Sequence, residues 1–116
     1  MISSAQRIAF ENLRSLGFAS VSASYAGVGG SFANPVRMLK IVNLTDINLI
    51  ISFDGTNPKD IIPSQSMFIY DYASNKIGPV DNLEQPLGQR VYVKQETGTA
   101  ATLGNVYVTV IYASSN

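Results

Sequence analysis

The first sixteen residues carry apolar side chains at helical spacing, which predicts an N-terminal α-helix over residues 4–16. The residues that share one stripe of this helix are Ala5, Ile8, Ala9, Leu13 and Leu16. Ser3 and Gln6 fit a capping box at its start, and Gly17 suits the left-handed residue that often ends a helix. A helix of about 13 residues is marginal alone, so we expect the stripe to dock on its own domain or on a neighbouring subunit.

Beyond Gly17 the period of the pattern changes from 3.6 to 2, which predicts β-strands. The strongest alternation runs from Ile47 to Phe53, with Ile47, Leu49, Ile51 and Phe53 on one face. Small apolar residues alternate with serines over residues 19–25, and the glycines that follow predict a flexible connection. The other candidate strands cover residues 36–42, 60–62, 66–72, 89–95 and 106–112.

Turn signals separate these candidates, and no helical pattern lies between them, so parallel βαβ units are not expected. We therefore expect an all-β fold: an antiparallel sandwich or barrel of jelly-roll or immunoglobulin-like size, with about seven strands. The predicted organisation is a helical arm over residues 1–17 and a single β-domain over residues 18–116. Pro63 makes residues 60–62 a candidate edge strand. The long polar connection over residues 73–89 is expected to contact a partner or to cover a sheet edge.

The composition argues against several classes of function but does not indicate a single one. Charged residues make up only 14% of the 116-residue chain and the net charge is +0, so a nucleic-acid footprint is not expected. The absence of cysteine and histidine excludes disulfides, thiolate catalysis and the commonest general base. No apolar run has the length of a membrane span, and residues 1–20 lack the pattern of a secretory signal.

The carboxylates give little indication of catalysis or metal binding, because they lie in or near predicted turns. Asp54 and Asp60 have the residue types of an acid–base pair, and with Asn57 they offer oxygen ligands to calcium. Aspartate is common in turns because it hydrogen-bonds its own backbone there, and we favour this interpretation. The turn carboxylates are Asp54, Asp60, Asp71, Asp81 and Glu84. We therefore expect no enzymatic activity, no metal site and no cofactor.

Tyrosines and basic residues on the predicted strands are candidates for a protein interface. The tyrosines are Tyr70, Tyr72, Tyr92, Tyr107 and Tyr112, which suit core packing, a protein interface or stacking on a ligand. The basic residues Arg37, Lys40, Arg90 and Lys94 form a small patch if their two strands pair. Together with the predicted helical stripe, these patterns give as candidate assembly residues Ile8, Leu13, Leu16, Tyr70, Tyr72 and Arg90.

A series of short motifs from Asn34 onward carries a resemblance to a known class of proteins. The motifs are Pro35-x-Arg37, Asn43-Leu44-Thr45-Asp46, Ile51-Ser52-Phe53-Asp54-Gly55, Asp71-x-x-Ser74-Asn75-Lys76, Val91-Tyr92-Val93-Lys94 and Gly104-x-Val106-Tyr107-Val108. In combination they resemble small β-sandwich virion proteins of tailed bacteriophages over about residues 34–112. Asn43-Leu44-Thr45 also matches a glycosylation acceptor, but without a secretory signal we expect no modification there.

The resemblance implies a non-enzymatic structural protein, present in repeated copies at the head–tail neck or connector or in the tail. Its partners would be copies of itself and other virion proteins such as portal, adaptor, tail or major capsid proteins. The location would be the virion, assembled in the host bacterial cytoplasm, with no membrane and no direct nucleic-acid contact. A capsid decoration (cement) protein is the alternative, and a carbohydrate-binding β-module is the second alternative.

Overall fold

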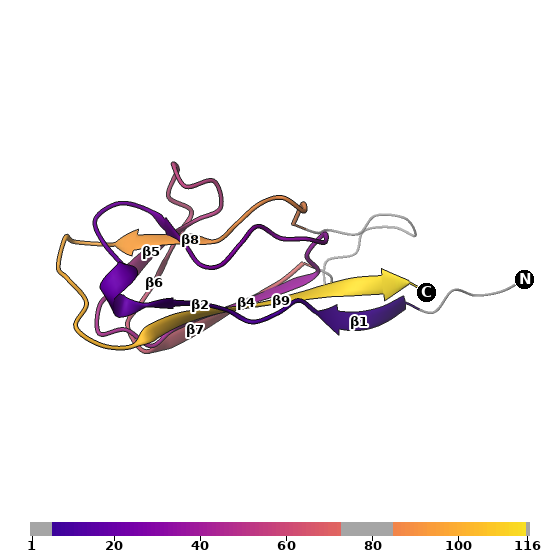
Figure 1. Ribbon diagram of the computed structural model, residues 1–116, viewed down its shortest axis with the longest axis horizontal. Helices are drawn as coiled ribbons and strands as arrows, with labels where there is room; N and C mark the ends of the chain where they lie inside the picture. Colours follow the sequence, from indigo (N-terminus) through magenta and orange to yellow (C-terminus); the bar gives the residue numbers. More distant parts are fainter. Residues whose placement is uncertain (1–5, 73–84, 116) are drawn as a thin grey trace, which may run out of the picture.

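The computed structural model describes residues 6–72 and 85–115, and within them it shows two antiparallel β-sheets that face each other (Figure 1). The expected all-β fold with a sandwich of two antiparallel sheets is confirmed. Among the described residues, the helical content is one turn of 3-10 helix, η1 (Phe18–Ser20). None of the helical segments in this part of the chain has the length and hydropathy needed to cross a membrane.

One sheet has five strands and is organised around the long C-terminal strand. Its members are β1 (Gln6–Phe10), β2 (Arg14–Gly17), β4 (Met38–Asn43), β7 (Ser66–Asp71) and β9 (Asn105–Ser115). The order is β1-β9-β4-β7, with β2 also paired to β9. Because β9 has 11 residues, β2 and β1 pair with successive halves of the same edge.

The second sheet has four strands in the order β3-β8-β5-β6. Its members are β3 (Ala26–Gly27), β5 (Leu49–Ser52), β6 (Asp60–Ile62) and β8 (Tyr92–Gln95). Among the described strands β6 pairs with β5 alone, so the prediction of an edge strand before Pro63 is confirmed.

The core lies between the two sheets, and the buried side chains alternate along the strands that frame it. On β4 the burial alternates, with Leu39 and Ile41 fully buried and their neighbours half-buried. The residues that share the core with them include Leu49, Ile51, Ile62, Val93, Val106, Val108 and Val110. Each isoleucine or leucine moved fully out of water contributes about 1.5–3 kcal/mol, so this layer is the main source of stability.

The predicted N-terminal helix is wrong: the described part of residues 4–16 forms β1 and β2, joined by a short connection. Gln6, proposed as part of a capping box, begins β1, and Gly17 ends β2 in extended backbone. The physical reason is competition for backbone hydrogen bonds. An isolated helix of this length is marginal, whereas strands here pair with the exposed edge of β9 and let Leu16 pack against the core.

Two further predictions concern segments between strands. Residues 19–25 do not form the predicted strand: η1 covers the first two, and Ser22 Oγ accepts a hydrogen bond from Ser24 N at 3.1 Å in a turn. Serine side chains compete in this way with ladder pairing. Of the 73–89 connection, residues 73–84 lie outside the described residues, and Gln85 forms a bridge with Val36.

Asn43 joins the two sheets through its buried side-chain amide. Its Nδ2 donates to the carbonyls of Ile47, Ile62 and Pro63 at 3.0, 3.2 and 3.1 Å. Its Oδ1 accepts from the backbone N–H and the hydroxyl of Thr45 at 3.0 and 2.6 Å. The Asn43 and Thr45 side chains are therefore structural groups, because both are fully buried and hydrogen-bonded to each other.

Candidate interaction surface

The face of the five-stranded sheet that points away from the core is largely apolar. Residues directly opposite each other in an antiparallel ladder share a face, so the pairing register defines this outer face. Its residues are Ile8, Phe10, Ser15, Met38, Lys40, Val42, Met67, Ile69, Asp71, Tyr107, Thr109, Ile111 and Ala113. We call this set the outer face.

The outer face is exposed where its strands lie at the edges of the sheet. Ile8 and Phe10 on β1 are 77% and 64% exposed, and Met67 and Ile69 on β7 are 54% and 53% exposed. A pair of large apolar side chains on each edge strand is unusual on a monomer surface, because contiguous apolar surface costs free energy in water. This arrangement is typical of a surface that another protein covers.

Five of the six candidate assembly residues fall into two groups, and the sixth, Arg90, contacts Gly29 and Tyr92. Ile8 and Leu13 are mostly exposed and available to a partner. Leu16, Tyr70 and Tyr72 instead pack against the core of their own chain. Ile8 is the member of the predicted set that lies on the outer face. The role of all six residues in assembly stays a prediction.

Tyr70 and Tyr72 stack on each other on the inner side of β7. Their rings are nearly parallel, with centroids 6.4 Å apart, and Phe53 meets Tyr70 edge-on at 6.3 Å. Burial, followed by the hydrogen bond to Asp60, raises the pKa of Tyr70 far above its usual value. Burial also raises the pKa of Tyr72. Both rings therefore extend the core and stay protonated at neutral pH.

Asp54 hydrogen-bonds within its own turn. Its Oδ1 accepts from the backbone N–H groups of Thr56 and Asn57, both at 2.8 Å, and from Ser52 Oγ at 2.8 Å. Its Oδ2 accepts from Asn57 Nδ2 at 2.9 Å. The hydrogen bonds from Asn57 and Thr56 hold the pKa of Asp54 well below its ordinary value. The carboxylate is thus a turn-forming group, as the sequence indicated.

Asp60 makes a separate set of contacts on β6. Its Oδ2 accepts from the hydroxyl of Tyr70 at 2.6 Å, and its Oδ1 accepts from Ile61 N at 2.8 Å. Within residues 6–72 and 85–115 no three acidic side chains gather into a metal-binding group. Asp71 ends β7, whereas Asp81 and Glu84 lie outside the described residues.

The basic residues do not form one patch, because their strands belong to different sheets. Lys40 lies on β4 in the five-stranded sheet, with Arg37 just before it, and Lys94 lies on β8 in the other. Arg90 donates from Nε to Gly29 O and lies 5.4 Å above the ring of Tyr92. The Lys94 ammonium lies 4.7 Å from the ring centre of Tyr25.

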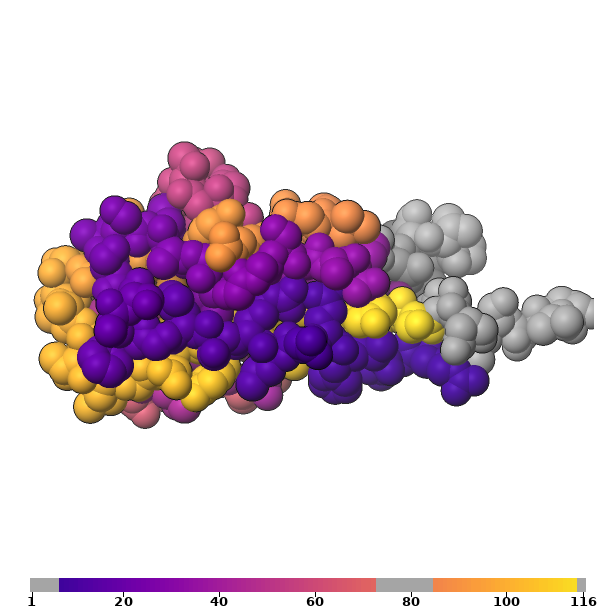
Figure 2. Space-filling model, viewed as in Figure 1, coloured from indigo at the N-terminus to yellow at the C-terminus, as the bar shows by residue number. Residues whose placement is uncertain are grey.

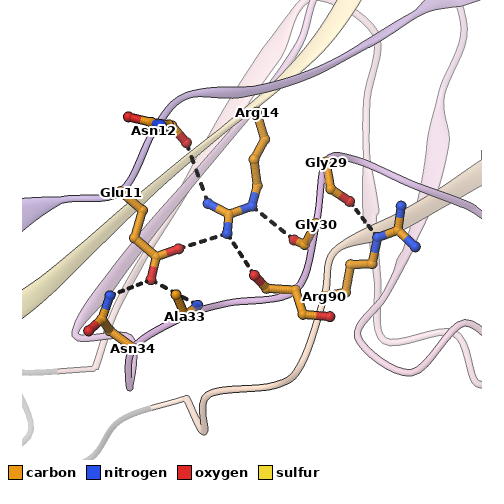
Figure 3. Close-up of polar contacts among 9 residues, drawn as sticks. Glu11, Asn12, Arg14, Gly29, Gly30, Ala33, Asn34 and Arg90 are labelled. Carbon is orange, nitrogen blue, oxygen red and sulfur yellow. Dashed lines mark hydrogen bonds and ion pairs between the residues drawn. The ribbon is translucent and has the colours of Figure 1, made fainter.

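The side chains of Arg14 and Glu11 hold the connection between β1 and β2 against the glycine-rich segment that contains Gly29 and Gly30 (Figure 3). We call this set of contacts the clasp. Arg14 donates to Glu11 Oε1 at 2.7 Å and to the carbonyls of Gly30 and Ser31 at 3.0 and 2.9 Å. Glu11 Oε2 accepts from Ala33 N and from Asn34 Nδ2. The space-filling view shows these two parts of the chain, indigo and purple, lying against each other over much of the visible face (Figure 2).

Glycine is required inside this clasp at Gly29. Its φ is +70°, which side chains rarely adopt, and a Cβ there would meet the Arg14 side chain at 2.5 Å. The glycine run that the sequence indicated as a flexible connection is therefore held by two arginine side chains.

Sequence reasoning placed Ile8 on the wrong element and missed Phe10, Met67 and Ile69 as surface residues. The available signal was the alternation itself: Met67 and Ile69 lie opposite Phe68 and Tyr70 in the predicted strand. Both faces of that strand are apolar, so the pattern alone does not say which face is buried.

Comparison with models of known protein families and with curated proteins finds no match for this chain. The chemistry of the outer face itself therefore carries the functional proposal.

Proposed function

We propose that this protein is a non-enzymatic structural component of a tailed-phage virion, assembled as repeated copies at the head–tail connector or in the tail. Its partners are further copies of itself and neighbouring virion proteins, and its place is the virion. The single observation that carries the proposal is the apolar outer face of the five-stranded sheet, with Ile8, Phe10, Met67 and Ile69 uncovered.

The exposed side chains are of the kind that permanent protein interfaces bury. Such interfaces are depleted in charge, and methionine and aromatic residues are enriched at their centres. The chain as a whole has 14% charged residues, well below the usual share of about 25%. A protein whose surface is covered by neighbouring subunits needs few charged residues to stay soluble. The low charge content therefore supports a place within an assembly.

The same face also supports the alternative of a capsid decoration protein. An apolar sheet face docks equally well on a capsid shell as on another copy of the chain. The two functions differ in the site occupied and in the number of copies. Binding to preformed capsids that lack the protein, with a gain in their thermal stability, would favour decoration over the connector or tail.

The second alternative is a carbohydrate-binding module, and fewer of its expected ligand-contacting residues are free to bind a sugar. Tyr70 and Tyr72 pack inward, and Asp54 is engaged in its own turn. A signal on a glycan array, with or without calcium, would favour this function over the structural one.

The test of the proposed function is to purify the particles made by the genome that encodes the chain and to quantify the chain by mass spectrometry. A connector or tail component is present at a fixed ratio to the other virion proteins, with about six or more copies per particle for a ring. Immunogold labelling then locates it at the neck or tail. Absence of the chain from washed particles overturns the proposal.

A further inference from the structure

The residues of the outer face include one cation and one anion, and the register fixes how these two lie relative to each other. Lys40 lies opposite Ile69 in the pairing of β4 with β7, and Asp71 lies two residues further along β7. Residues two apart in a strand share a face. Asp71 therefore lies one strand across from Lys40 and one same-face step along.

An aromatic side chain and a small residue show the same relation on the other half of the face. Phe10 lies opposite Ile111 in the pairing of β1 with β9, and Ala113 lies two residues further along β9. Since β7 and β9 both run antiparallel to β4, this step has the same direction as the step between the two charges.

Ala113 lines a pocket on this face, and Phe10 lies next to it. The pocket has a volume of about 250 Å³, which is room for one large side chain, and Ile8, Met38 and Ile111 also line it. Phe10 itself is 64% exposed. One face of the chain thus presents both an exposed aromatic side chain and an apolar pocket that can receive one.

A single two-fold axis in the plane of the contact exchanges the members of both pairs. On the regular lattice of a sheet, strands lie about 4.8 Å apart and same-face residues about 6.8 Å apart. The two steps are displaced from each other by about 9.6 Å across the strands and about 6.8 Å along them, which is perpendicular to either step. The line that bisects the step from Phe10 to Ala113 therefore also bisects the step from the cation to the anion.

The residues along this line are all apolar. The line runs diagonally across the face and passes close to Ile8, Ile111, Met38 and Ile69. Residues on a two-fold axis meet their own counterparts in the second copy, so a charge there would meet a like charge. The face has no charge at these positions, and Ile8 and Ile69 are 77% and 53% exposed.

We propose that two copies of this chain pack outer face to outer face across this two-fold axis. Phe10 of each copy enters the pocket beside Ala113 of the other, and Lys40 of each copy lies beside Asp71 of the other. The face is thus complementary to itself in both shape and charge, which favours a second copy over an unrelated partner. The strands of the two copies cross at about 70°, nearer the orthogonal than the aligned class of sheet packing.

The inference rests on the proposed packing of copies through the outer face, and it adds the symmetry of that contact and the residues that meet in it. A two-fold contact closes on itself, so a ring or a longer assembly needs a second interface elsewhere on the chain.

The experiment is sedimentation equilibrium of the full chain and of two charge-reversal variants, Lys40→Glu and Asp71→Lys, each alone and mixed in equal amounts. Each variant alone is expected to dimerise at least about tenfold more weakly than the wild type, because like charges meet twice in its dimer. In the mixed dimer every carboxylate again faces an ammonium group, so the mixture is expected to recover the wild-type affinity.

The variants Phe10→Ala and Ala113→Trp test the pocket in the same way, and they keep the test valid if Asp71→Lys fails to fold. The first removes the inserted side chain and the second fills the pocket, so each alone is expected to dimerise about tenfold more weakly. Their equal mixture is expected to recover affinity, because the indole of one copy occupies the space that the missing phenyl ring leaves in the other.

The matched control is Lys59→Glu, which reverses an exposed charge just before β6 in the other sheet and is expected to leave the affinity unchanged.

Three results would overturn the proposal. They are a wild type that stays monomeric up to its highest soluble concentration, single variants with the affinity of the wild type, and mixtures that associate no more tightly than their components. A wild type that associates but does not respond to these variants overturns this contact alone. The presence of the chain in purified particles is measured separately, so failure of this contact and failure of the proposed function are told apart.

Discussion

Asn43 shows how a single amide connects the two layers of this fold. Its side chain donates to three carbonyls and accepts from Thr45, with no exposure to solvent. From the sequence, Asn43 to Asp46 is polar turn material, whereas in the structure Asn43 is the last residue of β4 and the bend follows it. The connection to Ile62 and Pro63, some 20 residues away, depends on how β6 lies beside β4 and is not contained in any local pattern.

Replacing Asn43 by alanine is expected to lower the free energy of unfolding by about 2–4 kcal/mol. The change leaves three carbonyls and the Thr45 groups with fewer partners in a buried position. Equilibrium unfolding in urea measures the loss. Asn12→Ala is the control, because Asn12 is exposed, and it is expected to change stability by less than about 0.5 kcal/mol. Equal losses for both variants would contradict the account of Asn43.

Acid is expected to destabilise the fold through its hydrogen-bonded carboxylates. Burial raises the pKa of Glu11, but hydrogen bonds from Asn34 and Arg14 and the Arg14 charge lower it further, to below its ordinary value of 4.5. The hydrogen bonds from Thr102 likewise lower the pKa of Asp46. A carboxylate whose pKa is lowered by folding stabilises the folded state at pH values above its pKa in the unfolded chain. This stabilisation is lost as the pH falls toward its pKa in the folded chain.

Thermal unfolding between pH 7 and pH 3 tests this dependence. We expect Tm to stay nearly constant down to about pH 5 and to fall steeply below about pH 4. Glu11→Gln is expected to be less stable at pH 7 and to lose less stability on acidification, because one of the coupled carboxylates is gone. A Tm that rises on acidification would contradict the expected loss of stability at low pH.

At the scale of the element, the N-terminal segment shows why a periodic pattern was insufficient. The spacing of Ile8, Leu13 and Leu16 fits a helix, yet Ile8 and Phe10 also alternate as a strand does. The choice between the two depended on β9, about 100 residues later, whose edge offers backbone hydrogen bonds to both β1 and β2. The segments from β4 to β9 were predictable as strands because their alternation lies within each segment, as Leu39 and Ile41 illustrate. On β7, where both faces are apolar, the pattern did not say which face is buried.

Deleting residues 1–17 is therefore expected to destabilise the β-domain, whereas a helical arm would have been dispensable for folding. The truncation removes β1 and β2, uncovers one edge of β9 and removes the clasp made by Glu11 and Arg14. Circular dichroism and urea unfolding of the truncated chain are expected to show a lower midpoint or a loss of cooperative unfolding.

Deletion of residues 1–5 alone is the matched control, since it removes no strand of the described fold. We expect this shorter deletion to leave the urea midpoint within error of the full chain. A stable, cooperatively folded chain after deletion of residues 1–17 would show that β1 and β2 contribute little to the sheet.

At the scale of the whole molecule, the two faces of the five-stranded sheet have different roles. The inner face closes the core, while the outer face presents Ile8, Phe10, Met67 and Ile69 to its surroundings. A stable protein–protein interface buries about 800 Å² on each partner, which a sheet face of several strands can supply. The central claim is that copies of this protein pack together through that face.

Light scattering at two protein concentrations, on the wild type and on Met67→Lys/Ile69→Lys, tests this claim most directly. The lysines place two charges within the expected contact, on the edge strand β7, without entering the core. Leu103→Lys is the matched control, because Leu103 is 52% exposed and lies in a loop outside the outer face. We predict a multi-copy wild type, a multi-copy control and a monomeric double variant. A monomeric wild type at both concentrations, or a double variant with the wild-type mass, would contradict assembly through the outer face.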